Sequence, residues 1–566
     1  MCGILAMFGG SSVSAATFLA ALEKIRHRGP DAMRMQVTDG VTLGFQRLAI
    51  VDRHPSAIQP LTLPTWPTLT LLYNGEVYNH AEMTAEHRTD TRCDGEALVW
   101  AYARGGADMV CDTARGVFAA VIIDWSKRVV VVVRDPIGVR PLYRLTHDGV
   151  TAFGSELRSV ATLHPAASVE EFPAGTCATY ALLPSGELGD CLSSRRYFDV
   201  RALPPPPAPA SSPEALVEAT QTMPAELWAV RQQLITAVRH RCDVADVSIG
   251  ALLSGGLDSS VVCAIAAAHF KEIGRSFETF SIGLPGSTDV AAAVAVAKAA
   301  GLSHTIFEVS EEDCLAALPH VVESTSTWDV TTIRASTVMW LCAQRVRQAA
   351  PHIKVVLSGE GADEVCQGYV YFKKAPTAAA ADEESRRLIH ELPMYDVLRA
   401  DRSISAHSLE LRVPFLAVDF VEAFMALPAE LRQPLTPGDA PADAPLAARV
   451  EKLALRVACA GLLPWELIAR PKEAFSDGVS GLARPWYQVV QERAAVEVTD
   501  AELAAAGTTA PHATPRTKEQ LWFRSMYRHV VGDREDLDTL IAGPWLPRWC
   551  GDTQEASARA LDVFVA

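Results

Sequence analysis

The chain has 566 residues, of which 49% are hydrophobic and 21% charged, a composition typical of a globular rather than a disordered protein. Its formal net charge is −16 with no dense lysine/arginine run, which argues against nucleic-acid binding. The 12 cysteines form no C-x-x-C pair, and no apolar stretch reaches the ~18 residues of a membrane helix. We therefore expect a cytoplasmic protein with neither nucleic-acid nor membrane partners.

The first 200 residues contain short apolar runs separated by glycine, proline and aspartate, such as GVTLGFQRLAIVD, GVFAAVIIDW and RVVVVVRDPIG. Runs of this length, rich in β-branched residues and bounded by turn formers, are typical of strands. Residues 2–200 are therefore predicted to form a layered sheet domain with few helices.

A change of pattern marks the next part of the chain. The run PPPPAPASSP at 204–213 can form neither a helix nor an interior strand, so a linker is predicted at 201–218. Helical patterns then alternate with apolar strands such as VSIGALL and IKVVLSG, which predicts an α/β domain with a parallel sheet at 219–540. The run TPGDAPADAP at 436–445 is expected to be a mobile surface loop, and 541–566 a C-terminal tail.

Cys2 is the first residue with distinctive chemistry. Removal of Met1 would leave it with both a thiol and a free α-amine, which titrate near ~8.5 and ~7.7, so that the neutral amine could accept the thiol proton. This arrangement would permit amide hydrolysis through a thioester. A cysteine at position two also arises by chance in buried strands, so Cys2 alone does not decide the function.

Four further segments give Cys2 a specific context: RHRGPD at 26–31, RLAIVD at 47–52, YNGEVYNH at 73–80 and RDPIGVRPLY at 134–143. Together with MCGILAMFG they resemble the glutaminase domain of the N-terminal-nucleophile, or class II, glutamine amidotransferases. The resemblance implies an α+β fold in which two antiparallel sheets lie between helices in an αββα sandwich, followed by the α/β domain.

Roles for the N-terminal residues follow from this resemblance and from the chemistry of glutamine. A zwitterionic substrate needs a cation for its carboxylate, which Arg47 can supply, and an anion for its ammonium, which Asp94 can supply. Asn74 and the backbone N–H of Gly75 resemble the family's donors to the oxyanion, and Glu76 is expected to contact the substrate. An Asn-Gly pair taken alone is equally typical of an ordinary turn.

A glycine loop follows the strand VSIGALL and precedes an apolar helix. Adjacent glycines let backbone N–H groups approach a phosphate, and the helix N-terminus adds partial positive charge. The sequence contains neither G-x-x-x-x-G-K-[ST] nor G-x-G-x-x-G, and SGGLDSS instead resembles the AMP-forming ATP pyrophosphatases. The predicted ATP-binding residues here are Leu253, Ser254, Gly255, Gly256, Asp258, Ser259 and Ser260.

A second strand ends in the loop SGEGAD, and ligands gather at such strand ends. Ser358 and Gly359 are predicted to bind ATP as well. Carboxylate oxygens suit Mg²⁺, so Asp258 and Asp363 are predicted metal ligands. Glu360 then remains as a base for the proton that attacking ammonia must lose.

The resemblance extends to about residue 528 and is to the glutamine-dependent asparagine synthetases. It implies ATP and Mg²⁺ as cofactors, glutamine and aspartate as substrates, a β-aspartyl-AMP intermediate, and asparagine, glutamate, AMP and pyrophosphate as products. It also implies that Arg334 and Lys472 meet phosphate or a developing oxyanion, that Thr331 and Thr332 hold substrate, and that the protein is a homodimer. Ammonia would need an apolar passage between the domains.

Three features depart from the family pattern: Gln367 interrupts a usual Gly-Gly, Ala417 replaces an aspartate, and the Pro/Ala-rich run at 436–445 is inserted. None removes a predicted catalytic group. Alternative functions are amidation of another carboxylate, such as that of a peptide, β-lactam ring closure, or a non-catalytic scaffold. Ring closure needs no ammonia from glutamine, so Cys2, Arg47 and Asp94 count against it.

Overall fold

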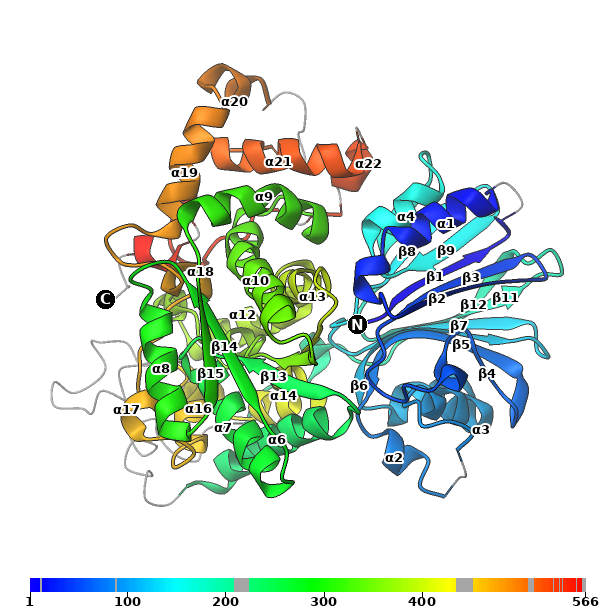
Figure 1. The fold of residues 1–566 in the computed structure, drawn as a ribbon, viewed down its shortest axis with the longest axis horizontal. Coiled ribbons are helices and arrows are strands. Elements are labelled where there is room, and N and C mark those ends of the chain that lie inside the picture. Colours follow the sequence, from blue (N-terminus) through cyan, green and yellow to red (C-terminus); the bar gives the residue numbers. More distant parts are fainter. Residues whose placement is uncertain are drawn as a thin grey trace.

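The computed structural model describes residues 1–10, 13–86, 89–207, 223–433, 451–506, 514–532, 534–538, 540–541, 543–555 and 557–561. Figure 1 shows two domains side by side, with the N-terminus between them. The predicted surface loop at 436–445 lies outside the described residues, as does the predicted linker from residue 208 onward.

The N-terminal domain contains two six-stranded antiparallel sheets, with the strand orders β10-β8-β9-β1-β3-β2 and β12-β11-β7-β6-β5-β4. The strands of the first sheet are β1 (Gly3–Phe8), β2 (Ala32–Thr38), β3 (Val41–Arg47), β8 (Tyr143–His147), β9 (Val150–Gly154) and β10 (Ser168–Glu171). Those of the second are β4 (Leu61–Leu63), β5 (Trp66–Val77), β6 (Gly116–Asp124), β7 (Val129–Arg134), β11 (Thr176–Leu182) and β12 (Leu188–Arg196).

Helices cover the outer face of each sheet (Figure 1). Helices α1 (Ala15–Glu23) and α4 (Leu157–Leu163) pack on the first sheet, and α3 (Glu96–Thr113) packs on the second, next to α2 (His80–Met83). The result is the αββα sandwich expected from the sequence.

The side chains of β6 alternate between the two faces of its sheet, which explains why the sandwich forms. Ala119, Val121 and Ile123 belong to the core between the two sheets, whereas Phe118 and Ala120 belong to the core beneath α3. Because successive side chains of a strand point to opposite faces, a strand that is apolar throughout is buried on both sides.

The second domain is built on one five-stranded parallel sheet, with the order β15-β14-β13-β16-β17. Its strands are β13 (Ser248–Leu252), β14 (Glu278–Gly283), β15 (Ser303–Glu308), β16 (Ile353–Leu357) and β17 (Glu410–Arg412). The α/β prediction is confirmed.

Most helices of this domain lie around the sheet, and the last four lie farther from it (Figure 1). The helices are α6 (Ala225–Asp243), α7 (Leu257–Glu272), α8 (Thr288–Ala300), α9 (Glu311–Thr325), α10 (Val330–Ala349), α11 (Ala362–Val365), α12 (Ala378–Glu391), α13 (Asp396–Ser405), α14 (Val418–Met425), α15 (Ala429–Arg432), α16 (Leu453–Ala458), α17 (Trp465–Ile468), α18 (Phe475–Gly478), α19 (Trp486–Glu497), α20 (Asp500–Ala506), α21 (Lys518–Val531) and α22 (Glu535–Asp538).

The two domains share a core and a set of buried charges. Met1, Leu48 and Ile50 of the first domain belong to the same hydrophobic cluster as the sheet of the second. Arg28 donates to both carboxylate oxygens of Asp401 in α13, at 2.8 and 3.2 Å. Since a buried charge is stable only when it is paired, these contacts fix how the domains meet.

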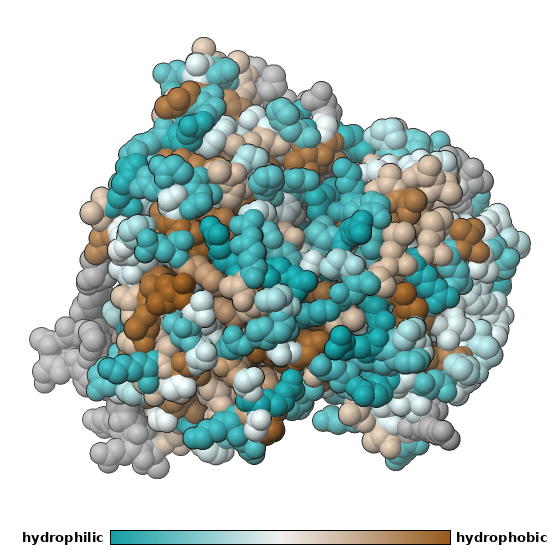
Figure 2. Space-filling model, in the orientation of Figure 1, coloured by the Kyte–Doolittle hydropathy of each residue, from teal (hydrophilic) through white to brown (hydrophobic). Residues whose placement is uncertain are grey.

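On the face drawn in Figure 2, hydrophilic residues cover most of the surface and hydrophobic residues form small separate groups. Among the described residues, no helix is both long enough and apolar enough to cross a membrane.

Candidate active sites

The first candidate site lies where Cys2 precedes β1. Gly3 pairs with Gln46 of β3, so Cys2 lies beside the end of that strand, where Arg47 is found. The Cys2 sulfur accepts a hydrogen bond from the Leu48 N–H at 3.4 Å. Burial raises the pKa of the Cys2 thiol, so a neighbouring base is needed to form the thiolate.

Asn74 and Gly75 lie near the C-terminal end of β5, opposite Ala119 and Phe118 of β6. The Asn74 side chain is fully buried, and neither its amide nitrogen nor its oxygen has a partner within the described protein. Gly75 has a φ of 150°, and a Cβ there would lie 2.1 Å from the Val117 oxygen, so only glycine fits. A buried amide without a partner suits binding of a polar ligand.

Two residues that are predicted to bind glutamine, Asp94 and Arg47, are held by hydrogen bonds within the protein. Asp94 accepts hydrogen bonds from the Tyr73 hydroxyl at 2.5 Å and from the Val77 N–H at 2.7 Å. Arg47 donates to the carbonyl oxygens of Asp52 and of His54, the latter at 3.2 Å. These bonds hold the guanidinium and the carboxylate in fixed orientations.

Glu76 makes a contact that the sequence does not reveal. It is buried and lies 3.2 Å from Arg412 in β17 of the second domain. Arg412 also donates to Glu410 at 2.8 Å, and Glu410 lies 3.5 Å from the Met1 ammonium. Strand β17 therefore brings charged groups of the second domain to the first site.

The second candidate site is a cavity of about 170 Å³ at the C-terminal ends of β13 and β16. Five of the residues that are predicted to bind ATP line it: Leu253, Ser254, Gly256, Asp258 and Ser259. The loop joins β13 to α7 in the order expected from the sequence.

Two predicted ATP-binding residues, Gly255 and Ser260, are not among the residues that line this cavity. Gly255 has a φ of 76°, and a Cβ there would lie 2.4 Å from the backbone nitrogen of Ala293 in α8. The residue therefore allows the loop to pack against α8. Ser260 is buried in the first turn of α7.

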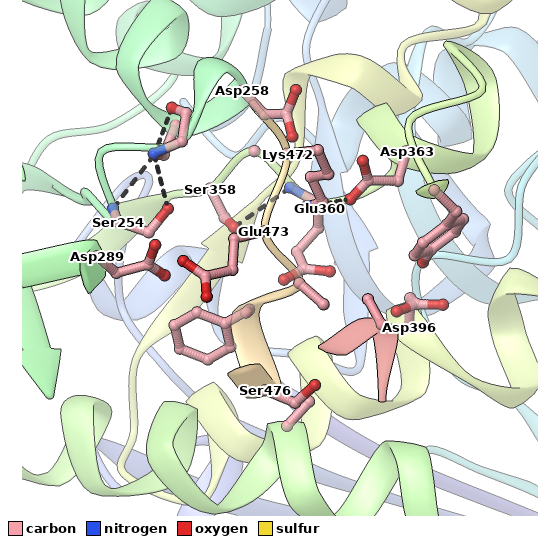
Figure 3. Close-up of a pocket in the computed structure, with 18 of the residues that line it drawn as sticks. Ser254, Asp258, Asp289, Ser358, Glu360, Asp363, Asp396, Lys472, Glu473 and Ser476 are labelled. Carbon is pink, nitrogen blue, oxygen red and sulfur yellow. Dashed lines mark hydrogen bonds and ion pairs between the residues drawn. The ribbon is translucent and has the colours of Figure 1, made fainter. Parts of the chain in front are cut away.

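Two lysines bind the predicted metal ligands, and Figure 3 shows one of them, Lys472, beside Asp363. Lys452 donates to Asp258 at 2.6 and 2.7 Å and lies 2.5 Å from Asp363. Lys472 lies 2.7 Å from the other oxygen of Asp363. The two lysines hold the pKa of the Asp363 carboxyl below its usual range against the effect of burial. Asp258 and Asp363 thus bind a shared positive charge.

Glu360 follows Ser358 and Gly359 in the loop after β16, and all three line the cavity. Arg399 lies 2.5 Å from Glu360 and 2.8 Å from Asp396. Burial raises the pKa of the Glu360 carboxyl, although Arg399 opposes this effect. A carboxylate with a raised pKa is a better proton acceptor near neutral pH.

The remaining predicted residues divide into two groups. Thr331 and Thr332 line the cavity at the start of α10. Arg334 is absent from the lining residues: its guanidinium binds Glu519 at 2.5 and 2.8 Å and Glu555 at 2.5 Å. Two carboxylates that are far from Arg334 in the sequence therefore bind its guanidinium.

Sequence reasoning assigned no role to many of the charged residues that line the cavity, among them Lys452, Arg399 and Asp289. Asp289 lies 3.0 Å from Arg470, and burial raises the pKa of its carboxyl to about 6. Arg399 lies in the segment YDVLRADRS, which carries the family resemblance, so a closer reading of that segment could have identified it. Lys452 and Asp289 carry no local sequence signal.

Comparisons with known proteins match both domains of the chain. The family model described as asparagine synthase matches residues 229–384 and 373–538, and that described as a glutamine amidotransferase domain matches residues 1–180. The chain is 38% identical over 584 residues to the asparagine synthetase [glutamine-hydrolyzing] of Homo sapiens, covering 100% of this chain and 99% of the human one. For the proteins of the same name from Gallus gallus and Mus musculus, the identities are 38% and 37% with the same coverage.

Proposed function

Because the chain belongs to the family of glutamine-hydrolysing asparagine synthetases, which it matches over its full length, we propose that its two sites perform the two halves of that reaction. The enzyme uses ATP to make asparagine with nitrogen from glutamine. The assignment of individual residues to each half is our proposal. It is supported mainly by the unpartnered Asn74 amide near Cys2 and by the lysine-bridged carboxylates in the second cavity.

In the first half, Cys2 becomes the N-terminal residue when Met1 is removed. Its amine accepts the thiol proton, and the thiolate attacks the glutamine amide to form a glutamyl thioester and ammonia. Asn74 and the Gly75 N–H stabilise the oxyanion. Arg47 binds the glutamine carboxylate and Asp94 its ammonium, while Glu76 contacts the substrate from its place beside Arg412. Water then hydrolyses the thioester to glutamate.

In the second half, the β-carboxylate of aspartate attacks the α-phosphate of ATP, giving β-aspartyl-AMP and pyrophosphate. Backbone N–H groups of the loop from Ser254 to Ser260, together with Ser358 and Gly359, cradle the phosphates. Ammonia attacks the acyl carbon, Glu360 accepts its proton, and AMP leaves. Lys472 stabilises the negative charge that develops, and Thr331 and Thr332 hold the substrates.

Asp258 and Asp363 fit the Mg²⁺ ion that we propose for this site. Mg²⁺ is commonly held by one or two carboxylates with waters and substrate phosphates completing its shell. In the structure a single ammonium group, that of Lys452, contacts both carboxylates, so their oxygens converge on one positive charge. When bound, the metal would neutralise pyrophosphate charge.

We also infer a cytoplasmic location and a homodimeric state. The location is supported by nine cysteines that are buried free thiols, as expected in a reducing compartment. The dimer rests on the family resemblance alone. Light scattering of the purified protein tests the dimer.

The decisive experiment compares the intact enzyme with Cys2→Ala, supplying aspartate and MgATP with either glutamine or ammonium. Both proteins should make asparagine, AMP and pyrophosphate from ammonium, but only the intact enzyme should do so from glutamine. Intact-mass analysis should show that the active protein lacks Met1. Glutamine-dependent synthesis by Cys2→Ala, or ATP cleavage without asparagine in the intact enzyme, would contradict the assignment.

A further inference from the structure

The C-terminal tail contributes to the wall of the synthetase cavity. Trp545, Pro547, Ala558 and Leu561 line that cavity together with the glycine loop. These four residues come from a stretch of the chain, residues 545–555 and 557–561, that we call the C-terminal segment. Its residues lie beyond the family-model matches, the last of which ends at residue 538.

One end of the C-terminal segment is attached to the start of α10. The Trp545 N–H donates to Asp329 at 2.9 Å, and the Thr331 hydroxyl donates to the Trp545 carbonyl at 3.3 Å. Asp329 is the N-cap of α10, where its other oxygen accepts from the Thr332 N–H at 2.8 Å. The segment therefore joins the helix turn that carries the two predicted substrate-binding threonines.

The other end is attached to the loop that carries Lys472. Arg559 donates a hydrogen bond at 2.9 Å to Glu473, the residue that directly follows Lys472. Glu473 also accepts a hydrogen bond from the Thr288 hydroxyl at 2.5 Å. Figure 3 shows Glu473 and Lys472 on adjacent positions of the loop, with Lys472 directed at Asp363.

A second pair of contacts holds the residues that follow this loop. The Ser557 hydroxyl donates to Asp477 at 2.7 Å, and the Ala558 N–H donates to the other oxygen of Asp477 at 3.0 Å. Asp477 is 1% exposed, and the Arg559 side chain is 5% exposed. Arg559 further donates to the carbonyls of Ser480 and Gly481, at 3.1 and 3.2 Å. These buried bonds join the C-terminal segment to both ends of the stretch from Glu473 to Gly481.

We propose that Arg559 and Ser557 are positioning residues for the synthetase reaction: they fix the loop at Glu473 and Asp477 so that Lys472 points into the cavity. The inference rests on the proposed role of Lys472 and assigns a role to the C-terminal segment. A charged bond to Glu473 in a buried setting limits the movement of the residue next to it. Small displacements of a catalytic group are expensive, since about 1 Å can reduce turnover by roughly 10²-fold.

The test compares Arg559→Gln, Arg559→Lys and Ser557→Ala with Arg484→Gln. Arg484 is the control because its guanidinium also pairs with carboxylates, those of Glu311 and Glu492, but it is exposed and does not line the cavity. The readouts are kcat and KM for ATP and aspartate with ammonium as nitrogen source, and glutamine hydrolysis without ATP.

Arg559→Gln should lower the synthetase kcat by roughly 10²-fold, with Arg559→Lys partly restoring it, while glutamine hydrolysis stays at the level of the intact enzyme. Ser557→Ala should lower kcat in the same direction, and Arg484→Gln should change neither activity. Normal kcat in Arg559→Gln overturns the proposal, as does an equal loss of both activities. If Arg559→Gln does not fold, Ser557→Ala becomes the test of the proposal. A normal kcat in Ser557→Ala then overturns the proposal. Failure of the intact enzyme to make asparagine would instead refute the proposed function.

Discussion

Replacing Arg28 with methionine removes a cation from the buried interface between the two domains. Arg28 is 0% exposed and donates to Asp401 at 2.8 and 3.2 Å, to Glu156 at 3.0 Å and to the Cys2 carbonyl at 3.0 Å. Methionine fills much of the same volume without the charge. The substitution therefore leaves two buried carboxylates with fewer partners and frees the backbone of the candidate nucleophile.

The expected cost follows from burial and from the partners that remain. Breaking a buried ion pair by removing one member costs about 3–5 kcal/mol, equivalent to a factor of roughly 10² to 10⁴ in an equilibrium constant. Asp401 keeps Arg402 at 2.8 Å and Arg140 at 3.5 Å, so we expect the lower end of that range. The pKa of the Asp401 carboxyl, about 2 in the native state, should rise in the variant.

Urea denaturation with hydrogen exchange as the probe measures this cost, because exchange reports peptides on both sides of the interface separately. Arg28→Met and Asp401→Asn should each destabilise the interface, and the double variant by less than their sum, with a coupling energy of about 0.5–3 kcal/mol. Single-variant costs below about 1 kcal/mol, or strict additivity, would show that the pair does not hold the domains together.

Three further predictions concern the synthetase site. Gly255→Ala should lose synthesis but keep glutamine hydrolysis. A Cβ at this position would lie 2.4 Å from the Ala293 nitrogen and force the glycine loop to move, and the left-handed backbone costs alanine a further ~1–2 kcal/mol. A normal KM for ATP would contradict this prediction. Burial raises the pKa of Glu360, and a base must be deprotonated to accept a proton. Synthesis should therefore fall, as the pH decreases, at a higher pH than the ~4.3 at which an ordinary glutamate titrates. Glu360→Gln should lower kcat by about 10²–10⁴-fold and remove that acidic limb from the pH–rate profile, and an unchanged limb would assign it to another group. Lys452→Met should lower the melting temperature, because Asp258 and Asp363 lose the ammonium group that they share. For the same reason, added Mg²⁺ should stabilise this variant more than the intact protein. Equal stabilisation of both proteins would remove support for the metal site.

The local features of both sites could be predicted from the sequence. Cys2 before a strand, Asn-Gly-Glu within β5 and SGGLDSS between β13 and α7 all depend on neighbours within a few residues. Strand period, glycine conformation and the helix N-terminus are short-range properties, so the sequence by itself determined the two sheet types and the loops that carry the candidate groups.

Tertiary structure alone decided which charges meet. Lys452 reaches Asp258 across 194 positions of the chain, and Arg334 is bound by Glu519 and Glu555 rather than lining the cavity. Arg559 similarly reaches Glu473 from the C-terminal segment. A long charged side chain has little local preference for one partner, and its energy depends on which carboxylate lies within about 4 Å once water is excluded. That distance is fixed by the packing of elements far apart in sequence, which no local pattern records.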